Sequence, residues 1–298
     1  MSTEGVSTEG VNPRTADIDE LSPTEILRRI NAEDATVARA VAREIDAIAA
    51  VTERVIAAFE AGGRLIYVGA GTSGRLGALD AAECPPTYSS DPCQVQALLA
   101  GGPAAMTSSV EAAEDNTEAG ARDVDRLDVD GRDVVLGIAA SGRTPYVVGA
   151  LCRAGERGAR TAALVGNRQG TVADAAELVI APDTGAEVVA GSTRMKAGTA
   201  QKLVLNMIST TAMIRTGHTY RNLMVDLRAS NSKLRTRARR IVGEATGVDP
   251  DTAARALAEA DGEVKTAIVM LTADVTAGAA RQRLAREHGV VRGALDGA

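Results

Sequence analysis

The sequence predicts an α/β protein whose doubly wound parallel sheet is followed by a small helical module at the C-terminus. Between about residues 64 and 216, short runs of buried-type residues alternate with longer helical patterns. This alternation indicates βαβ units, in which a parallel sheet carries helices on both faces. Beyond about residue 230 the strand pattern stops, and short helical segments separated by Gly and Pro follow. We therefore expect an N-terminal extension (1–22), an α/β domain (23–230) and a helical module (231–298).

Two helices are expected before the sheet. Ser22-Pro23 has the pattern of an N-cap followed by a first helical residue, which opens a short helix through about Asn31. Residues 35–61 then place apolar side chains at spacings of three and four, as a long amphipathic helix does, and Gly62-Gly63 ends it. The apolar positions are Val37, Val41, Ile45, Ile48, Val51, Val55 and Phe59.

Five strands are expected from short runs rich in Val, Leu, Ile and Ala. The run DVVLGIAAS has the composition of a strand that is buried on both faces. The expected strands are 64–68, 94–101, 133–141, 160–166 and 176–182.

Helices are expected between and after these strands. The helix after the first strand should run to about Cys84, because Pro85-Pro86 follows. Thr144-Pro145 repeats the N-cap pattern and opens a helix to about Arg157. Segment 108–127 is acidic and helical in composition. Further helices are expected at 195–216, 231–247, 250–262, 263–274 and 276–289.

The composition restricts the class of protein. Aromatic residues make up only 2% of the 298 residues and the net charge is −6, so we do not expect nucleic-acid binding; the basic run at 233–240 should be a solvated helix face. Three cysteines without C-x-x-C spacing indicate reduced thiols. No apolar run reaches the length of a membrane span. The polar N-terminus, with its repeated STEGV, should be a frayed tail and lacks a secretion signal, so we expect a cytoplasmic protein.

The stretch GAGTSG, residues 69–74, matches the dinucleotide-binding pattern G-x-G-x-x-G between an expected strand and an expected helix. A dinucleotide site also needs an acidic residue about 20 positions further on, at the end of the next strand. That strand ends in LLAGGP, without a carboxylate. Thr72 and Ser73 instead add hydroxyls to backbone N–H groups that can bind an anion. We therefore interpret this loop as a site for a terminal phosphate.

Two more loops carry the same chemistry. SGRTPY, residues 141–146, follows a strand and supplies Ser141 and Thr144, and GSTRMKAGT, residues 191–199, supplies Ser192 and Thr193. Such loops gather at the carboxyl ends of parallel strands, so three of them together indicate a site for a small phosphorylated ligand. The alternative is that each hydroxyl is an ordinary helix cap.

Long stretches of the chain resemble the N-acetylmuramic acid 6-phosphate etherase family. These are GAGTSGRLGALDAAECPPT, AAEDN, GIAASGRTPYV and GAEVVAGSTRMKAGTAQKLVLNMIST, with TEGVNPRTADIDELSP near the start and NLMVDLRASNSKL later. The resemblance covers nearly the whole chain and implies a sugar isomerase (SIS) domain at 23–230 that binds phosphosugars. One departure is Ala112 in VEAAEDN, where the family pattern is VEGAEDN.

The resemblance implies cleavage of the D-lactyl ether at C3 of the sugar, which gives N-acetylglucosamine 6-phosphate and D-lactate. An alkoxide is a poor leaving group, so elimination is expected instead of direct displacement. Ring opening exposes an aldehyde at C1 and makes the C2 proton acidic; a base removes that proton and an acid protonates the departing ether oxygen. Water then adds to the unsaturated aldehyde. This chemistry needs two proton-transfer groups and neither a metal nor a redox cofactor.

By resemblance, Glu83 in ECPPT is the proton donor and Glu114 in AED is the second catalytic glutamate, the base. Glu83 precedes Pro85-Pro86, so we expect it at a helix C-terminus, where the macrodipole raises the pKa of a carboxyl group. Whether Glu114 begins or ends a helix stays open, and only a helix start would favour its ionised form. Its acidic surroundings alone are typical of a solvated helix face.

The two histidines allow different roles. His288 is expected to be structural, and His218 lies either near the site or at a helix end where carbonyls satisfy it. No metal-ligand cluster and no Ser-His-Asp set is evident, which leaves carboxylates for the proton transfers.

The substrate-binding residues are expected from the three hydroxyl loops. Ser73 and Ser141 should bind phosphate, by analogy with related phosphosugar-binding domains. Arg75, Arg143, Arg194 and Lys196 offer positive charge for the phosphate and the lactyl carboxylate. The expected set is Thr72, Ser73, Gly74, Arg75, Ser141, Gly142, Arg143, Thr144, Ser192, Thr193 and Lys196.

Two other functions stay open at this point. An aldose–ketose isomerase on the same fold would also need an acid–base pair, and a phosphosugar sensor would bind without using the glutamates. ECPPT and AED together favour the etherase. The resemblance further implies a homodimer, since this fold often completes its site from a neighbouring subunit.

Overall fold

The computed structural model describes residues 10–227 and 232–296. The chain divides into two compact units. The first unit comprises Met1–Ala82 and Cys93–Ser209, and the second comprises Glu83–Pro92 and Thr210–Ala298. The boundary expected near residue 230 thus falls inside the second unit, on residues that the structure does not describe. Most of the repeated STEGV segment, which was expected to be a frayed tail, also lies outside the described residues.

A five-stranded parallel sheet forms the centre of the first unit, in the order β2-β1-β3-β4-β5. This confirms the predicted doubly wound sheet. Gly69 pairs with Leu99 on one side and with Ile138 on the other, and the strand order reverses between β1 and β3. The strands are β1 (Leu65–Gly69), β2 (Val95–Leu99), β3 (Val134–Ala139), β4 (Arg160–Val165) and β5 (Leu178–Ile180).

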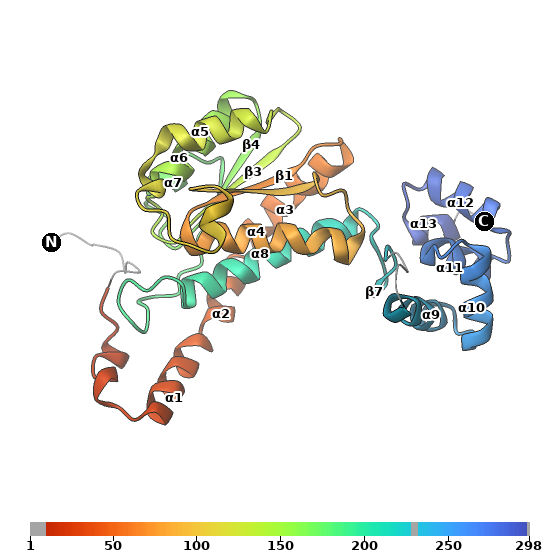
Figure 1. Ribbon diagram of the computed structural model, residues 1–298, viewed down its shortest axis with the longest axis horizontal. Coiled ribbons are helices and arrows are strands. Elements are labelled where there is room, and N and C mark those ends of the chain that lie inside the picture. The colour runs from red at the N-terminus through yellow and green to blue at the C-terminus, as the bar shows by residue number, and fades with distance from the viewer. Residues whose placement is uncertain (1–9, 228–231, 297–298) are drawn as a thin grey trace. The chain divides into compact units, whose positions relative to one another are not determined.

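Helices cover both faces of this sheet, as predicted (Figure 1). α5 (Thr117–Arg126), α6 (Pro145–Glu156) and α7 (Thr171–Asp174) share one apolar core with β1, β3 and β4. α3 (Ile45–Glu60) packs on the other face, where Gly77 of α4 (Gly71–Tyr88) also meets the sheet: a Cβ at Gly77 would lie 2.9 Å from Tyr67 Cβ. α8 (Lys196–Arg215) packs against α4, because Asn206 donates to Asp80 at 2.6 Å. α1 (Pro23–Asp34) precedes them and opens with a complete capping box at Ser22.

The single helix expected over residues 35–61 is wrong. The structure has two helices there, α2 (Val37–Ala42) and α3, because the chain departs from helical geometry at Glu44. The Glu44 carboxylate accepts from Ala181 N at 3.0 Å and from Arg168 at 2.9 Å. A tertiary contact therefore interrupts a pattern that is helical by periodicity.

The helix expected over residues 108–127 is shorter than predicted. α5 begins only at Thr117, with the Asn116 side chain accepting from Ala119 N as its N-cap. The preceding residues include a single 3-10 turn, Ala113–Asp115, which starts from Ala112 in the left-handed region at φ 56°.

The predicted end of α4 near Cys84 is also wrong, because the helix continues to Tyr88 with Pro85 and Pro86 inside it. The prolines lack an N–H, so the carbonyls of Ala81 and Ala82 lose their helical partners. The last turn persists because Ser89 N donates to Pro85 O at 2.9 Å and His218 Nδ1 contacts Tyr88 O at 2.9 Å. The division between the two units falls between Ala82 and Glu83, where these helical bonds are missing.

The second unit has its own apolar core, built from the small hairpin β6 (Thr219–Tyr220) and β7 (Leu223–Met224) and from the C-terminal helices. The four predicted helices are confirmed, and α13 was not predicted. Exposed Arg235, Arg237 and Arg239 on α9 confirm the solvated basic face. The helices are α9 (Ser232–Thr246), α10 (Pro250–Glu259), α11 (Val264–Ala273), α12 (Ala277–Arg286) and α13 (Val291–Asp296).

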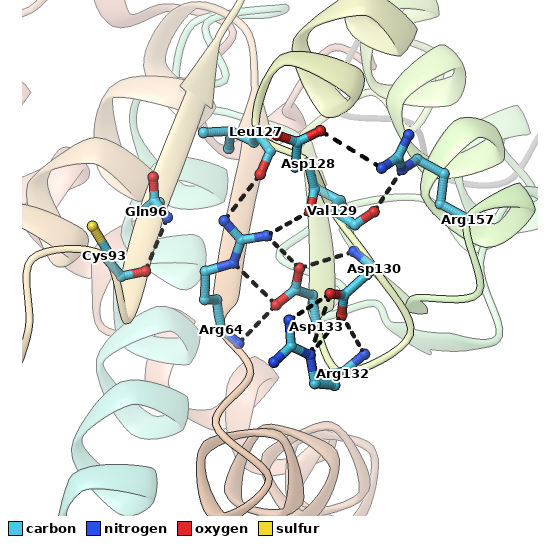
Figure 2. Close-up of polar contacts among 10 residues, drawn as sticks. All are labelled: Arg64, Cys93, Gln96, Leu127, Asp128, Val129, Asp130, Arg132, Asp133 and Arg157. Carbon is cyan, nitrogen blue, oxygen red and sulfur yellow. Dashed lines mark hydrogen bonds and ion pairs between the residues drawn. The ribbon is translucent and has the colours of Figure 1, made fainter.

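A polar cluster joins β1 and β3 at their amino ends, opposite the edge where ligands bind to such sheets (Figure 2). The Arg64 guanidinium donates to both carboxylate oxygens of Asp133, with Nη2–Oδ2 at 2.6 Å, and to Leu127 O at 3.0 Å. Asp133 is buried, and its hydrogen bonds raise the pKa of Arg64 further. This cluster stabilises the strand pair and leaves the carboxyl ends free for other chemistry.

Within the described residues, none of the helices combines the length and the apolarity that crossing a membrane requires.

Candidate active site

The carboxyl ends of β1 and β3 are where an open parallel sheet of this strand order forms its ligand crevice. The loop after β1 leads into α4 and the loop after β3 leads into α6. Two of the three hydroxyl loops are therefore neighbours through the β1–β3 pairing, in which Gly69 lies opposite Ile138.

The β1–α4 turn is tight enough to require glycine. A Cβ at Gly74 would lie 2.6 Å from Gly69 O and 2.4 Å from Leu99 Cδ1, so any side chain there would force the turn apart. Gly71 has φ 52°, in the left-handed region. The N–H groups of the first turn of α4 are thereby placed at the end of β1, where the helix dipole favours an anion. Ser73, in this turn, is buried, and its Oγ lies 3.0 Å from Gln201 Oε1 of α8.

The β3–α6 turn also uses a left-handed glycine, Gly142 at φ 72°. Ser141 is half-buried and accepts from Arg143 N at 3.3 Å, and the Arg143 side chain is exposed. Thr144 is the N-cap of α6 by position, yet its side chain makes no capping hydrogen bond. The ordinary helix-cap interpretation therefore fails for Thr144.

The third hydroxyl loop lies against the first. A Cβ at Gly198, in the first turn of α8, would lie 3.5 Å from Thr72 Cγ2 and 3.5 Å from Thr193 O. Ser192 and Thr193 are half-buried just before this turn. The structure thus brings Thr72 and Ser73 next to the start of α8.

Lys196 does not face these loops. Its side chain is fully buried, and its Nζ lies 2.8 Å from Glu33 Oε2. The expected substrate contact is therefore replaced by an internal ion pair, because Glu33 already neutralises this charge. Glu187 accepts from the backbone N–H groups of Lys196 and Ala197 at 3.0 and 2.9 Å, and so binds the start of α8.

Glu33 is a buried charged position that the sequence pattern did not reveal. Its carboxylate also accepts from Arg14 and from Asn12, whose amide contacts Ala186 O as well. Hydrogen bonding by Arg14, with smaller effects of Lys196 and Asn12, lowers the pKa of Glu33 to about 2. This cluster connects the segment before α1 to the loop that leads into α8. The sequence gives no signal for this cluster, because nothing in it distinguishes a buried glutamate in a helix from an exposed one.

A cavity of about 230 Å³ joins Glu114 to the β1–α4 turn. Gly71, Arg75, Glu111 and Glu114 are among its lining residues. Arg75 donates to Ala105 O at 2.8 Å and to Ser108 O at 3.2 Å, so it holds the chain that forms the far wall. Glu114 lies in the 3-10 turn before the N-cap of α5, on the side where a helix dipole favours negative charge. The question left open by the sequence is thus answered: Glu114 precedes a helix.

Glu83 belongs to the second unit and is exposed on α4. Since α4 continues to Tyr88, Glu83 is not at a helix C-terminus, and the positional argument for it as an acid loses its premise. The turn that follows is held by a cluster that we name the His218 clamp, formed by His218, Asp226 and Lys265. His218 Nδ1 and Lys265 Nζ each lie 2.7 Å from Asp226 Oδ2, and Ser89 donates to Asp226 O.

The clamp bears on the two roles left open for His218. Nδ1 faces two acceptors beyond the end of α8, Tyr88 O and the Asp226 carboxylate, so a backbone carbonyl satisfies this nitrogen as one of the two interpretations expects. A cavity of about 730 Å³ beside the clamp is lined by Ser89, Asp226, Lys265 and Arg281, among others.

His288 lies after α12 at φ 50°, away from the clamp residues in sequence. In the described part of the chain, no group of three or more His, Cys, Asp or Glu is placed to hold a metal ion.

The comparisons with known proteins agree with one another. Residues 47–154 match the family model described as the glucokinase regulatory protein N-terminal SIS domain. Proteins named N-acetylmuramic acid 6-phosphate etherase are similar along nearly their whole length. The one from Mycolicibacterium smegmatis is 52% identical over 99% of this chain and 99% of its own. Those from Exiguobacterium sp. and Streptomyces coelicolor are each 54% identical, over 97% and 98% of this chain and 99% and 94% of theirs.

The fold has counterparts among solved structures. A candidate phosphosugar isomerase involved in capsule formation, from Bacteroides fragilis, aligns with a TM-score of 0.51 at 20% identity. The alignment covers 65% of this chain and 92% of that one. At this identity the likeness concerns the fold alone, and it supports the SIS-type α/β architecture.

Proposed function

The chain belongs to the N-acetylmuramic acid 6-phosphate etherase family, and on that premise we propose that it is a carbon–oxygen lyase acting on N-acetylmuramic acid 6-phosphate. It cleaves the D-lactyl ether and yields N-acetylglucosamine 6-phosphate and D-lactate, a step in the recycling of cell-wall amino sugars. The observation that carries this proposal is identity above half along nearly the full length of these relatives.

The phosphate is bound where the hydroxyl loops meet. N–H groups of the first turn of α4 and the hydroxyls of Thr72, Ser73 and Ser141 surround an anion at the end of the sheet. Ser192 and Thr193 add hydroxyls from the start of α8, which lies against Thr72. Arg143 and Arg75 supply positive charge, although Arg75 also holds the Ala105 and Ser108 carbonyls.

The reaction proceeds by proton transfers alone. Ring opening exposes the C1 aldehyde, and Glu114 takes the C2 proton; a cavity lined by both Glu114 and Gly71 of the β1–α4 turn supports this role. Glu83 gives a proton to the ether oxygen as the C3–O bond breaks and lactate leaves. Water then adds at C3 of the unsaturated aldehyde, and the two glutamates return to their starting states. No cofactor is required by this chemistry.

The family premise also leads to expectations for the cellular location and the oligomeric state. We expect the enzyme to act in the cytoplasm as a homodimer, in which the neighbouring subunit completes the site. Analytical ultracentrifugation would measure the mass in solution, and a monomer at micromolar concentration would contradict this expectation.

A single assay separates the candidate functions. The protein is incubated with N-acetylmuramic acid 6-phosphate, and D-lactate is measured with a coupled dehydrogenase. Stoichiometric lactate supports the etherase. Conversion of a hexose 6-phosphate to its ketose without lactate would indicate an isomerase, and binding without either product would indicate a sensor.

A further inference from the structure

A half-paired side-chain amide lies buried beside the phosphate-binding turn. Gln201, on α8, is 3% exposed, and its Oε1 accepts from Ser73 Oγ at 3.0 Å. Its Nε2 has no hydrogen-bond partner in the part of the chain that the structure describes. Ser73 is 7% exposed in the first turn of α4.

This arrangement is unfavourable for both Gln201 and Ser73. A buried N–H₂ group carries two donors and is costly to leave unpaired. A serine hydroxyl has a single proton, and here that proton is given to Gln201, so Ser73 cannot donate to an anion. A phosphate in the turn would meet the hydroxyl oxygen without its hydrogen.

One rotation solves both problems. The oxygen and nitrogen of a glutamine amide have nearly the same shape, so turning the amide by half a revolution exchanges them without moving any other atom. Nε2 then donates to Ser73 Oγ, and the Ser73 proton becomes available. The oxygen that is left unpaired is an acceptor, and an unpaired acceptor is better tolerated than an unpaired N–H₂.

We infer that Gln201 is a positioning residue that donates to Ser73 and thereby turns the Ser73 hydroxyl toward the phosphate of the bound sugar. The inference deepens the proposed function and rests on it. A chain of donors from amide to hydroxyl to phosphate strengthens each bond, and the last one is assisted by the ligand's charge. A phosphate is almost purely an acceptor, so this relay favours a phosphorylated sugar over its free alcohol.

The test uses two variants of Gln201 and measures binding directly. Gln201→Met keeps the length and apolar volume but has no donor. Gln201→Glu keeps the shape, and its carboxylate can only accept. Isothermal titration calorimetry with N-acetylglucosamine 6-phosphate and with inorganic phosphate gives the affinity, and thermal melts report whether each variant is folded.

We expect about a tenfold weaker affinity for Gln201→Met, which corresponds to one lost hydrogen bond to a charged group. KM should rise by a similar factor while kcat changes less than about twofold. Gln201→Glu should bind about 100-fold more weakly at pH 8, because a negative charge then faces the phosphate. Its affinity relative to wild type at the same pH should recover toward pH 5, since a protonated carboxyl can donate as the amide does.

A double-mutant cycle shows whether Gln201 acts through Ser73. In a Ser73→Ala background, Gln201→Met should change affinity less than about twofold, because the hydroxyl that it orients is gone. An equal loss in both backgrounds, unaltered affinity in the single variants, or a pH response matching wild type would each overturn the inference.

These experiments distinguish a failure of the positioning role of Gln201 from a failure of the proposed function. If wild type binds the phosphosugar and the Gln201 variants lose affinity, but no lactate is released, the positioning role stands and the etherase proposal fails. If lactate is released and the variants bind normally, the positioning role fails and the etherase stands. Should Gln201→Met melt before binding can be measured, Gln201→Glu at pH 5 and pH 8 carries the test alone.

Discussion

At the scale of single residues, Glu83 is the strongest test of the mechanism. It is exposed on α4, and we propose it as the acid that protonates the leaving oxygen. Glu83→Gln should lower kcat by about 10²–10⁴-fold, as expected when one general acid is removed, while product affinity stays close to wild type. Steady-state lactate release and calorimetric titration of N-acetylglucosamine 6-phosphate measure the two quantities. Glu53→Gln, at another exposed helical glutamate, is the control. Activity retained in Glu83→Gln would remove it from the acid role.

Ala112 carries a second prediction at this scale. It lies at φ 56°, in the left-handed region that favours glycine, and it directly precedes the turn that holds Glu114. Ala112→Gly should raise the free energy of unfolding by about 0.5–1 kcal/mol, because relief of strain exceeds the added entropy of the unfolded chain. Urea denaturation measures the effect. Ala113→Gly, in the adjacent 3-10 turn, should instead destabilise, and the same sign in both variants would contradict this account.

Among the elements, α4 depends on the His218 clamp for its last turn. His218→Ala removes the contacts to Tyr88 O and to Asp226, which frees the segment that carries Glu83. We expect kcat to fall by about tenfold with little change in KM, because the residues that we propose for phosphate binding are not part of the clamp. His218→Asn keeps a donor at the Nδ1 position and should retain most of the activity. Equal losses in both variants would show that the imidazole ring, and not its hydrogen bonds, is what matters.

The start of α8 depends on the buried pair between Lys196 and Glu33. Lys196→Met leaves Glu33 with fewer partners and should destabilise the protein by about 3 kcal/mol. The double variant Glu33→Leu, Lys196→Met should be less destabilised than the sum of its parts, since apolar pairs often replace buried ion pairs at little cost. Denaturant midpoints measure all three proteins. Additive losses would mean that the two side chains do not act as a pair.

For the molecule as a whole, Glu33 makes stability depend on pH. Its pKa is lowered from 4.5 to about 2 in the folded state, chiefly by the hydrogen bond from Arg14. The folded state therefore binds this proton less readily than the unfolded chain does. The contribution, about 3 kcal/mol, is fully present above pH 4.5 and is lost as the pH falls toward 2.

Urea unfolding at pH 6, 4 and 3 follows this loss. The Glu33→Gln variant cannot titrate at this position, so its stability should fall less steeply over the same range. Parallel curves for the two proteins would rule out Glu33 as the source.

Local patterns were sufficient wherever one element's own residues decide its form. The strand runs, the helix starts at Ser22-Pro23 and Thr144-Pro145, and the glycines of the β1–α4 turn each predicted what the structure contains. Glycine at residue 74 is required by contacts that any tight strand-to-helix turn makes, so the turn between β1 and α4 could be predicted from GAGTSG. The motifs around Glu83 and Glu114 could be matched to a family because each is a short run of consecutive residues.

Contacts between distant residues could not be read in this way. The break at Glu44, the extension of α4 past two prolines and the burial of Lys196 each depend on a partner that lies far away in the chain. Sequence alone determined the α/β class, the hydroxyl loops and the family. Only the tertiary structure decided that Lys196 pairs with Glu33 and that Gln201 lies against Ser73, because a side chain's charge and hydrogen bonds are settled by whatever packs beside it.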